Sequence, residues 1–412
     1  MIPWPVKYKF LTPGVIILII IALNGLTFLA IRFISGIGAV TNLDNVTPWG
    51  LWIGVDVAAG VALAAGGFTS AALGHIMHRE YYHVIVRPAL LTAMLGYTFV
   101  AFAVFVDIGR FYYIWHPLVM WNGNSALFEV GICVMIYMTV LYIEFLPIVT
   151  ERFIGRVDLP GFLKSLNKTV DDVLRYLDNR LSLTMFIFII AGVVLSTLHQ
   201  SSLGTLMVIA GQKMHPLWQT PVLPLLFLLS AISVGFPMVM FESLIASRSF
   251  KLKPEMKILS RLGNMVAPIL GVYIAVKIGD VFIRETFKYI LIFDSTAWMF
   301  IAEFALIFIA FILFLSKKIT HSPLGLFIAS KLVIAGVLLN RFNNFVVAYN
   351  PFFNPVKYYP SFGEISVTLG CIALLVLVYR TIVMIFPVIS QERTDLNKKV
   401  VEFYNTKTER SK

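Results

Sequence analysis

One carboxylate lies inside a long apolar stretch of this sequence. Asp56 stands about two turns into segment 48–77, PWGLWIGVDVAAGVALAAGGFTSAALGHIM, which has the length of a membrane-spanning helix. Burying a charge at that depth is costly, and residues placed there commonly serve a function. The same segment is rich in Ala and Gly, which let neighbouring helices approach closely enough to exclude lipid. We therefore expect Asp56 to face a protein interior.

Further polar side chains recur near one end of the apolar segments, which we call the outer half. They are Asp56, Asp107, Arg110, Glu129, His199, Gln200, Asp280, Arg284, Glu303 and Arg341. Acids and bases at similar depth can satisfy one another, and Asp107 and Arg110 are spaced to pair on one helix face. A polar residue at a helix end can also simply reach the lipid headgroups. For Asp107, Arg110, Asp280 and Arg341, each considered alone, this is an equal alternative to a functional role. For Asp56, Glu129 and His199, which are deeper or in more polar surroundings, we favour function.

The inner half is sparser in ionisable groups. It holds Glu144, Glu242 and Lys331, with Arg380 expected to reach toward the cytoplasmic face. Glu144 and Glu242 could be steps of a proton path toward the outer residues, and a packing or topological role is an equal alternative.

Haem and iron–sulfur ligation are both disfavoured by the residues available. The seven histidines are His75, His78, His83, His116, His199, His215 and His321. Only His75 and His199 are expected inside spans, and they lie toward opposite faces, whereas bis-histidine haem needs ligands at matching depth. Two cysteines, Cys133 and Cys371, cannot hold an iron–sulfur cluster alone. We therefore expect no haem, cluster or other metal in this chain, so that redox work would need a partner and a diffusing ligand such as a quinone.

The composition excludes a soluble globular protein. Hydrophobic residues make up 58% of 412 residues, charged residues only 13%, and the mean hydropathy is +0.84. Ten apolar windows can cross the bilayer: 13–35, 48–75, 88–109, 125–149, 182–202, 221–246, 263–282, 296–316, 323–345 and 361–387. We predict an all-α integral membrane fold, residues 1–412 in one polytopic domain, with two four-helix half-bundles and two flanking helices. The first window is read as a transmembrane helix, being too long for a signal peptide.

The basic residues indicate the orientation. With both termini on one side, 23 of the 33 Lys and Arg residues fall on that side and seven on the other, so both termini, including the tail 388–412, are predicted to be cytoplasmic. The net charge of +11 is thereby explained without nucleic acid.

Within 150–181, apolar residues repeat at helical spacing between charges, which predicts an amphipathic helix on the membrane surface. The opposite loops, rich in aromatics with apolar tips, favour a docked extramembrane partner over a simple interfacial belt.

Several motifs together resemble one known family. They are PWGLWIGVDVAAG from Pro48, YHVIVRPALLTAMLGY from Tyr82, VDIGRF from Val106, NSALFE from Asn124, and LHQSSLGTLMVIAGQKMHPLWQ from Leu198, which includes Trp218. In combination they resemble the NrfD-like family of polysulfide reductase membrane subunits over roughly residues 15–390. The nearest branch looks like the ten-helix membrane subunits of hydrogenase 2 and of a menaquinone reductase.

The resemblance implies a cofactor-free subunit that binds menaquinone near the periplasmic face of the bacterial inner membrane, close to a docked iron–sulfur subunit. It implies proton handling by Glu129, and quinone contacts from His199 and Gln200 with Asp107 and Arg110 nearby. Further redox subunits would be a multihaem cytochrome and a molybdopterin-like protein, or a nickel–iron subunit in a hydrogenase.

Three hypotheses follow for function. The first is the quinone-site subunit of a respiratory oxidoreductase, inactive alone, that reduces menaquinone with coupled and electrogenic proton uptake. In it Glu129, Asp56, Asp107, Glu144 and Glu242 transfer protons, and the quinone contacts His199, Gln200, Arg110 and Trp218. The others are an ion-coupled secondary transporter, since buried carboxylates among ten helices also describe such carriers, and a passive anchor, which would not need Asp56 or Glu129.

Overall fold

The computed structural model describes residues 2–44, 47, 50–76, 82–351 and 357–391. Ten helical segments in these ranges are long and apolar enough to cross a membrane, which confirms the predicted all-α membrane fold. The long helices are α1 (Pro13–Ser35), α2 (Leu51–Leu63) continued by α3 (Gly66–Ala71), α4 (His83–Asp107), α5 (Ala126–Phe153), α6 (Asn167–Ala210), α7 (Leu223–Phe250), α8 (Met256–Ile283), α10 (Ser295–Leu315), α12 (Pro323–Phe342) and α13 (Phe362–Ile385).

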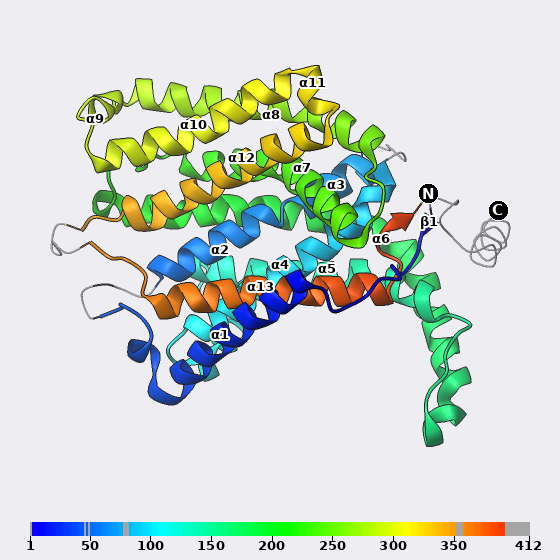
Figure 1. Cartoon of the computed structure of the whole chain (residues 1–412). Helices are drawn as coiled ribbons and strands as arrows, with labels where there is room; N and C mark the ends of the chain where they lie inside the picture. The colour runs from blue at the N-terminus through cyan, green and yellow to red at the C-terminus, as the bar shows by residue number, and fades with distance from the viewer. Residues whose placement is uncertain (1, 45–46, 48–49, 77–81, 352–356, 392–412) are drawn as a thin grey trace.

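Short elements connect or extend these helices. They are β1 (Ile2–Pro3), η1 (Ile37–Ala39), η2 (Ala72–Ile76), η4 (Phe111–Tyr113), η5 (His116–Leu118), η6 (Gly161–Leu166), η7 (Gly211–Lys213), α9 (Phe287–Ile290), α11 (Lys317–Thr320), η8 (Asn343–Val347) and β2 (Ser390–Gln391). The strands β1 and β2 pair antiparallel, with Ile2 opposite Gln391, so the two ends of the described chain meet at one end of the bundle (Figure 1). We call this the termini end and the opposite one the loop end.

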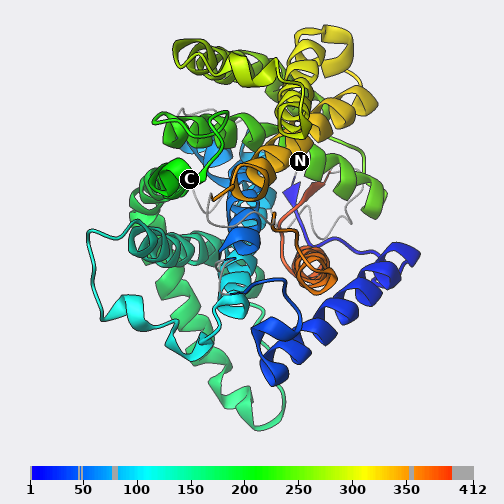
Figure 2. The ribbon, with the colours of Figure 1, turned by 90° about the vertical axis from the view of Figure 1, so that its left-hand side faces the viewer.

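The helices form two halves and a flanking pair, as Figure 2 shows in a view along the bundle. The first half contains α2 to α6, and the second contains α7, α8, α10 and α12. The flanking helices α1 and α13 pack on each other through two glycines: a Cβ on Gly25 would lie 2.6 Å from the Gly370 Cα. This close approach of backbones is typical of small residues between membrane helices.

The segment α2–α3 lies at the centre, where the first half packs against α7 and α12 of the second (Figure 2). Ala58, Val61 and Ala62 in it are completely buried. A Cβ on Gly67 would lie 2.4 Å from the Ala93 Cβ of α4, so the small residues of this segment do permit close helix packing.

The helix is interrupted between α2 and α3, and a neighbouring helix compensates. The Ala65 amide bonds to the Ala62 carbonyl at 3.2 Å instead of reaching Val61. The freed Val61 carbonyl accepts a hydrogen bond of 2.8 Å from the Gln200 side-chain amide of α6. A buried carbonyl without a partner would be costly, so Gln200 stabilises the break.

The first turns of α6 extend beyond the bundle at the termini end (Figure 1). There the Asp171 carboxylate accepts from the Gly155 amide at 2.6 Å and from Arg175 at 2.8 Å. These donors hold the pKa of Asp171 below its ordinary value, the Gly155 amide contributing most. Val173 and Tyr176 are exposed. Within the predicted segment 150–181, residues 161–181 are thus helical, whereas 156–160 are not. Their place on a membrane surface remains a prediction. Residues 392–412 of the predicted tail lie outside the described part.

Candidate functional site

An apolar cavity of about 330 Å³ opens at the loop end, among helices of the first half. Its wall is made by Gly50, Ile53, Gly54, Val57, Val100, Ala101, Val104, Ile108, Tyr113, Ile114, Pro117, Leu127, Val130, Gly131, Val134, Met135, Leu203, Leu206 and Phe345. Tyr113 alone among them carries a polar side chain. The volume and the apolar lining fall in the range typical of small-molecule pockets.

Glycines determine the shape of this cavity. A Cβ on Gly54 would lie 2.4 Å from the Phe345 ring, so Gly54 lets that ring close the inner wall, whereas a Cβ on Gly131 would meet nothing within 4 Å and would point into open space. Replacing Gly131 with a larger residue would therefore fill the cavity without a clash at Cβ.

Tyr113 lines the cavity and His116 packs against it, and the sequence analysis singled out neither side chain. Tyr113 ends η4 and His116 begins η5, and their ring centroids are 4.4 Å apart. In the sequence both residues belong to a loop rich in aromatic side chains. Their i, i+3 spacing could have indicated that the two rings lie together. The conformation of the loop, which places Tyr113 in the cavity wall, depends on contacts distant in sequence.

Glu129 lies beside this cavity. It is in the first turn of α5, is exposed, and accepts a hydrogen bond of 2.6 Å from the Ser202 hydroxyl of α6. The following residues, Val130 and Leu203, both line the cavity. Glu129 is thus shallower than Asp56 or His199, and a helix N-terminus stabilises a carboxylate there.

Asp56 is half-buried against α13. The Thr368 hydroxyl donates to its carboxylate at 2.7 Å, and the Trp52 indole N–H donates to Thr368 at 2.9 Å. Its neighbour Val57 lines the cavity. The carboxylate therefore faces protein at about the depth of the cavity, but on another side of α2.

The predicted pair of Asp107 and Arg110 is wrong. Helix α4 ends at Asp107, so no helical spacing joins the two residues, and Arg110 is exposed in the following turn. Asp107 instead forms an ion pair of 2.7 Å with Arg32 of α1, both side chains being buried. Arg110 contributes nothing to the cavity wall.

His199 and Gln200 lie deeper than the sequence indicated. Helix α6 continues to Ala210, so His199 is about 11 residues, or roughly 16 Å, from the helix end. Both residues are fully buried. Neither His199 ring nitrogen nor the Gln200 carbonyl oxygen has a hydrogen-bond partner among the described residues. They lie below the cavity floor, one turn from Leu203.

Trp218 belongs to a separate network in the second half. Its indole donates to Glu303 at 3.2 Å, and Glu303 also accepts from Asn340 at 3.1 Å and from Asn343 at 2.6 Å, and pairs with Lys277. All four partners and Glu303 are buried. The structure does not bring Trp218 together with His199.

The other outer residues of the second half also pair locally. Asp280 pairs with Arg284 at 2.6 Å, and Arg341 donates to the Ser230 hydroxyl at 2.7 Å while its guanidinium lies 3.7 Å from the Phe227 ring centroid. The ten outer residues are therefore not one cluster but several groups in two halves.

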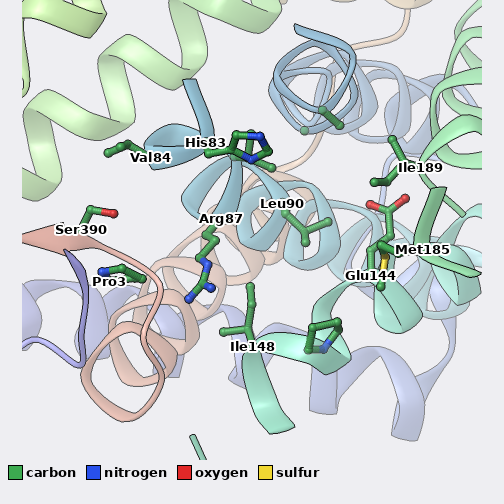
Figure 3. Close-up of a pocket in the computed structure, with 14 residues that line it drawn as sticks. Pro3, His83, Val84, Arg87, Leu90, Glu144, Ile148, Met185, Ile189 and Ser390 are labelled. Atoms are coloured by element: carbon green, nitrogen blue, oxygen red, sulfur yellow. The ribbon is translucent and has the colours of Figure 1, made fainter. Parts of the chain in front are cut away.

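The two inner carboxylates line different cavities at the termini end. Glu144 lies in the wall of a cavity of about 430 Å³, with Arg87 and His83 (Figure 3). Glu242 accepts from the Thr92 hydroxyl at 2.6 Å and lines a cavity of about 40 Å³ with Glu255 and Tyr379. Arg380, expected to reach toward the cytoplasmic face, donates to the Lys9 carbonyl at 2.6 Å and to Ser249 at 3.1 Å.

These features define a multi-pass helical membrane protein with an apolar cavity flanked by ionisable residues. The chain belongs to the NrfD family: the model described as "Polysulphide reductase, NrfD" matches residues 39–350, which confirms the resemblance drawn from the motifs.

Curated relatives cover nearly the whole chain. A protein of Nitratidesulfovibrio vulgaris is 37% identical over 92% of this chain and 95% of its own. The probable Ni/Fe-hydrogenase 2 b-type cytochrome subunit of Escherichia coli is 30% identical over 94% of this chain and 95% of its own. The menaquinone reductase integral membrane subunit of Nitratidesulfovibrio vulgaris is 26% identical over 89% and 88%. These names place two of the relatives as membrane subunits of oxidoreductase complexes.

The described histidines do not provide a matched pair for haem. His75 in η2, His83 and His321 lie on segments at the termini end, His116 and His215 at the loop end, and His199 in mid-helix. In the described ranges no three His, Cys, Asp or Glu residues gather as a metal site. Absence of haem and clusters remains a prediction from these positions.

Proposed function

We propose that this protein is the menaquinone-binding membrane subunit of a respiratory oxidoreductase complex, and that the apolar cavity at the loop end is the quinone site. The observation that carries the proposal is the cavity itself: about 330 Å³, lined by apolar residues and one tyrosine, in a chain related to a menaquinone reductase subunit. A naphthoquinone ring with the start of its isoprenoid tail matches that lining.

The residues around the cavity suit quinone chemistry. Reducing a bound quinone takes two electrons and two protons. Tyr113, supported by His116, can donate a hydrogen bond to a quinone oxygen from the mouth. Glu129 can exchange a proton near the same place, with Ser202 holding its carboxylate. Asp56 and Asp107 lie behind the wall, and His199 and Gln200 beneath it.

The electrons would come from an iron–sulfur subunit docked on the loop end. Most Lys and Arg residues lie on the side of the termini. This excess supports cytoplasmic termini in a bacterial inner membrane, and hence a periplasmic loop end. Exposed aromatics such as Trp115 and Trp121 offer a docking surface there. If protons are taken from the cytoplasm, the reaction is electrogenic, and each charge moved is worth about 2.3 kcal/mol per 100 mV.

The choice between a menaquinone reductase and a hydrogenase-type complex depends on the partner. The relative named as a hydrogenase subunit shares 30% identity and the one named as a menaquinone reductase subunit 26%. A molybdopterin-like protein with a multihaem cytochrome copurifying with this chain would favour the reductase, and a nickel–iron subunit the hydrogenase. The subunit is inactive alone in either case.

The test is to fill the cavity. Gly131→Phe should abolish menaquinone bound to the purified complex, measured by extraction and native mass spectrometry, and quinone turnover should fall at least ~100-fold. Gly279→Phe is the matched control, because a Cβ on Gly279 of α8 also meets nothing within 4 Å. Menaquinone retained by Gly131→Phe at the control level would refute this site.

Glu129→Gln should keep bound menaquinone and complex assembly but impair quinone turnover. Wild-type turnover in this variant would remove Glu129 from the mechanism.

A further inference from the structure

A groove of about 560 Å³ opens on the second half of the bundle at the termini end. It lies between the last turns of α7 and the first turns of α12, two helices that pack on each other (Figure 1). Apolar side chains form most of its wall, among them Leu244, Ile245, Leu324 and Phe327, and Arg248 lines it with two serines. The volume is within the range of ligand pockets.

The apolar part of the groove belongs to membrane-spanning helices. Both α7 and α12 are among the ten candidate spans, and Ile245 lies about one and a half turns before the end of α7. Ile245 and Leu324 are exposed. The Phe327 ring is held in the wall by stacking on Phe241, with ring centroids 5.3 Å apart. Since exposed apolar side chains at this depth face the hydrocarbon of the bilayer, an acyl chain fits this part of the groove.

The polar part of the groove lies at the end of α7, where the span reaches the membrane surface. The Arg248 guanidinium is exposed and has no hydrogen-bond or ion-pair partner within the described ranges. The Ser249 hydroxyl accepts a hydrogen bond of 3.1 Å from Arg380, a buried cation directly behind this wall. An unpaired guanidinium beside serine hydroxyls is a donor set that suits a phosphate group.

The chain around the groove is strongly basic. The segments 243–262 and 315–325, at the termini end of the second half, contain seven Lys and Arg residues and one acid, Glu255. Lys251 and Lys253 stand on either side of a wall residue of the groove, and both are exposed. An anionic headgroup at this place would therefore meet several cations.

The termini end of the first half has a different charge balance. Segment 150–181 contains six basic and five acidic residues, and Arg175 pairs there with Asp171 at 2.8 Å. In the cavity of about 430 Å³ on that half, Arg87 is already paired with Glu151 at 2.7 Å. A role in membrane orientation explains basic residues anywhere on this side, but it does not explain why the uncompensated ones gather beside an apolar groove.

We propose that the groove between α7 and α12 is a binding site for an anionic phospholipid of the leaflet at the termini end. Arg248 and the Ser247 hydroxyl bind the lipid phosphate, and one acyl chain lies along Leu244, Ile245 and Phe327. The bound lipid bridges the two helices and offsets the repulsion among the neighbouring cations, so it stabilises the second half. The site is separate from the loop-end cavity, and the proposal holds whether or not that cavity binds quinone.

The first experiment measures the lipid selectivity of the delipidated, purified complex by native mass spectrometry and thermal melts. Phosphatidylglycerol should bind at least ~10-fold more tightly than phosphatidylcholine with the same acyl chains, and should raise the melting temperature as its concentration rises. Glycerol 3-phosphate, which has the phosphate but no acyl chain, should do neither. Equal binding of the two lipids would overturn the anionic site. Glycerol 3-phosphate bound as tightly as phosphatidylglycerol would overturn it in favour of a soluble phosphate compound.

The second experiment removes the proposed phosphate contact. Arg248→Gln should weaken phosphatidylglycerol binding by about 5–10-fold, and Arg248→Lys should keep part of the affinity. Lys168→Gln is the matched control, because it removes one exposed positive charge at the termini end of the first half, and it should bind the lipid like the wild type. Wild-type affinity in Arg248→Gln would refute the site, and an equal loss in Lys168→Gln would show a general effect of charge instead.

The third experiment locates the lipid in the whole complex. A phosphatidylglycerol that carries a photoreactive group in its acyl chain should label peptides that contain Ile245 or Phe327, and this labelling should fall in Arg248→Gln. Labelling confined to other helices would overturn the proposal. So would a cytoplasmic protein subunit that crosslinks across the groove in place of the lipid.

Discussion

Arg32 and Asp107 form a buried ion pair of 2.7 Å between α1 and α4, although 75 residues separate them in sequence. Helix α1 otherwise packs mainly on α13, so this pair connects the flanking helices to the first half of the bundle. A buried charge that loses its partner is expensive, commonly about 3–5 kcal/mol, whereas replacing both partners with apolar residues is often nearly neutral.

Arg32→Met and Asp107→Leu should therefore each lower the thermal stability of the detergent-solubilised protein strongly, and the double variant should recover most of the loss. The measurement is a set of thermal melts of the four proteins. Additive losses in the double variant would show that the two side chains do not act as a pair.

This pair also shows where sequence reasoning stops. Hydropathy windows gave the ten spans because a helix must satisfy its own backbone in lipid, and all ten are present. Asp56 lies about one and a half turns into α2, and His199 lies deeper than the sequence indicated, because α6 continues well past the predicted end at 202. Depth alone could not tell which helices touch. The family motif grouped Trp218 with His199, whereas tertiary packing assigns Trp218 to Glu303.

The cavity itself was beyond sequence analysis for a related reason. Its wall consists of residues that look like ordinary core or lipid-facing positions, such as Val100 and Leu203. The open space arises from Gly131 and from a loop that folds back at Tyr113. The family motifs supplied the functional hypothesis that composition could not.

The network around Glu303 is expected to stabilise the second half and not to bind quinone. Glu303→Gln would leave Lys277 buried without its counter-charge, and should cost about 3–5 kcal/mol. Trp218→Phe removes only the hydrogen bond to Glu303 and keeps the packing against Phe300, with centroids 5.6 Å apart, so it should cost about 1 kcal/mol. Bound menaquinone, measured as for Gly131→Phe, should be unchanged in both. Loss of menaquinone in Trp218→Phe at wild-type stability would move the quinone site to the second half.

The contact between α1 and α13 depends on Gly25 and Gly370. A Cβ on Gly370 would lie 2.7 Å from the Gly25 Cα, and backbone cannot move aside cheaply. Gly370→Ala should therefore destabilise the protein by about 1–3 kcal/mol and loosen the flanking pair. Gly14→Ala is the opposite case, because a Cβ there meets nothing within 4 Å and Ala is the better helix former, by up to about 1 kcal/mol. Thermal melts should show changes of opposite sign, and equal losses would mean that close packing at Gly370 is not the cause.

The loop before α8 should make stability depend on pH through Glu255. Burial raises the pKa of Glu255 from 4.5 to about 7. Between these values the folded protein holds a proton that the unfolded chain has released, so stability is lost as pH rises from about 4.5 to about 7, and the full penalty applies above that. Glu255→Gln, which cannot ionise, should melt like the wild type at pH 5 and roughly 1–3 °C higher at pH 8. Glu285→Gln, at an exposed site paired with Lys288, is the control and should show no such trend. A stabilisation by Glu255→Gln that is the same at pH 5 and pH 8 would mean that side-chain packing, and not ionisation, is responsible.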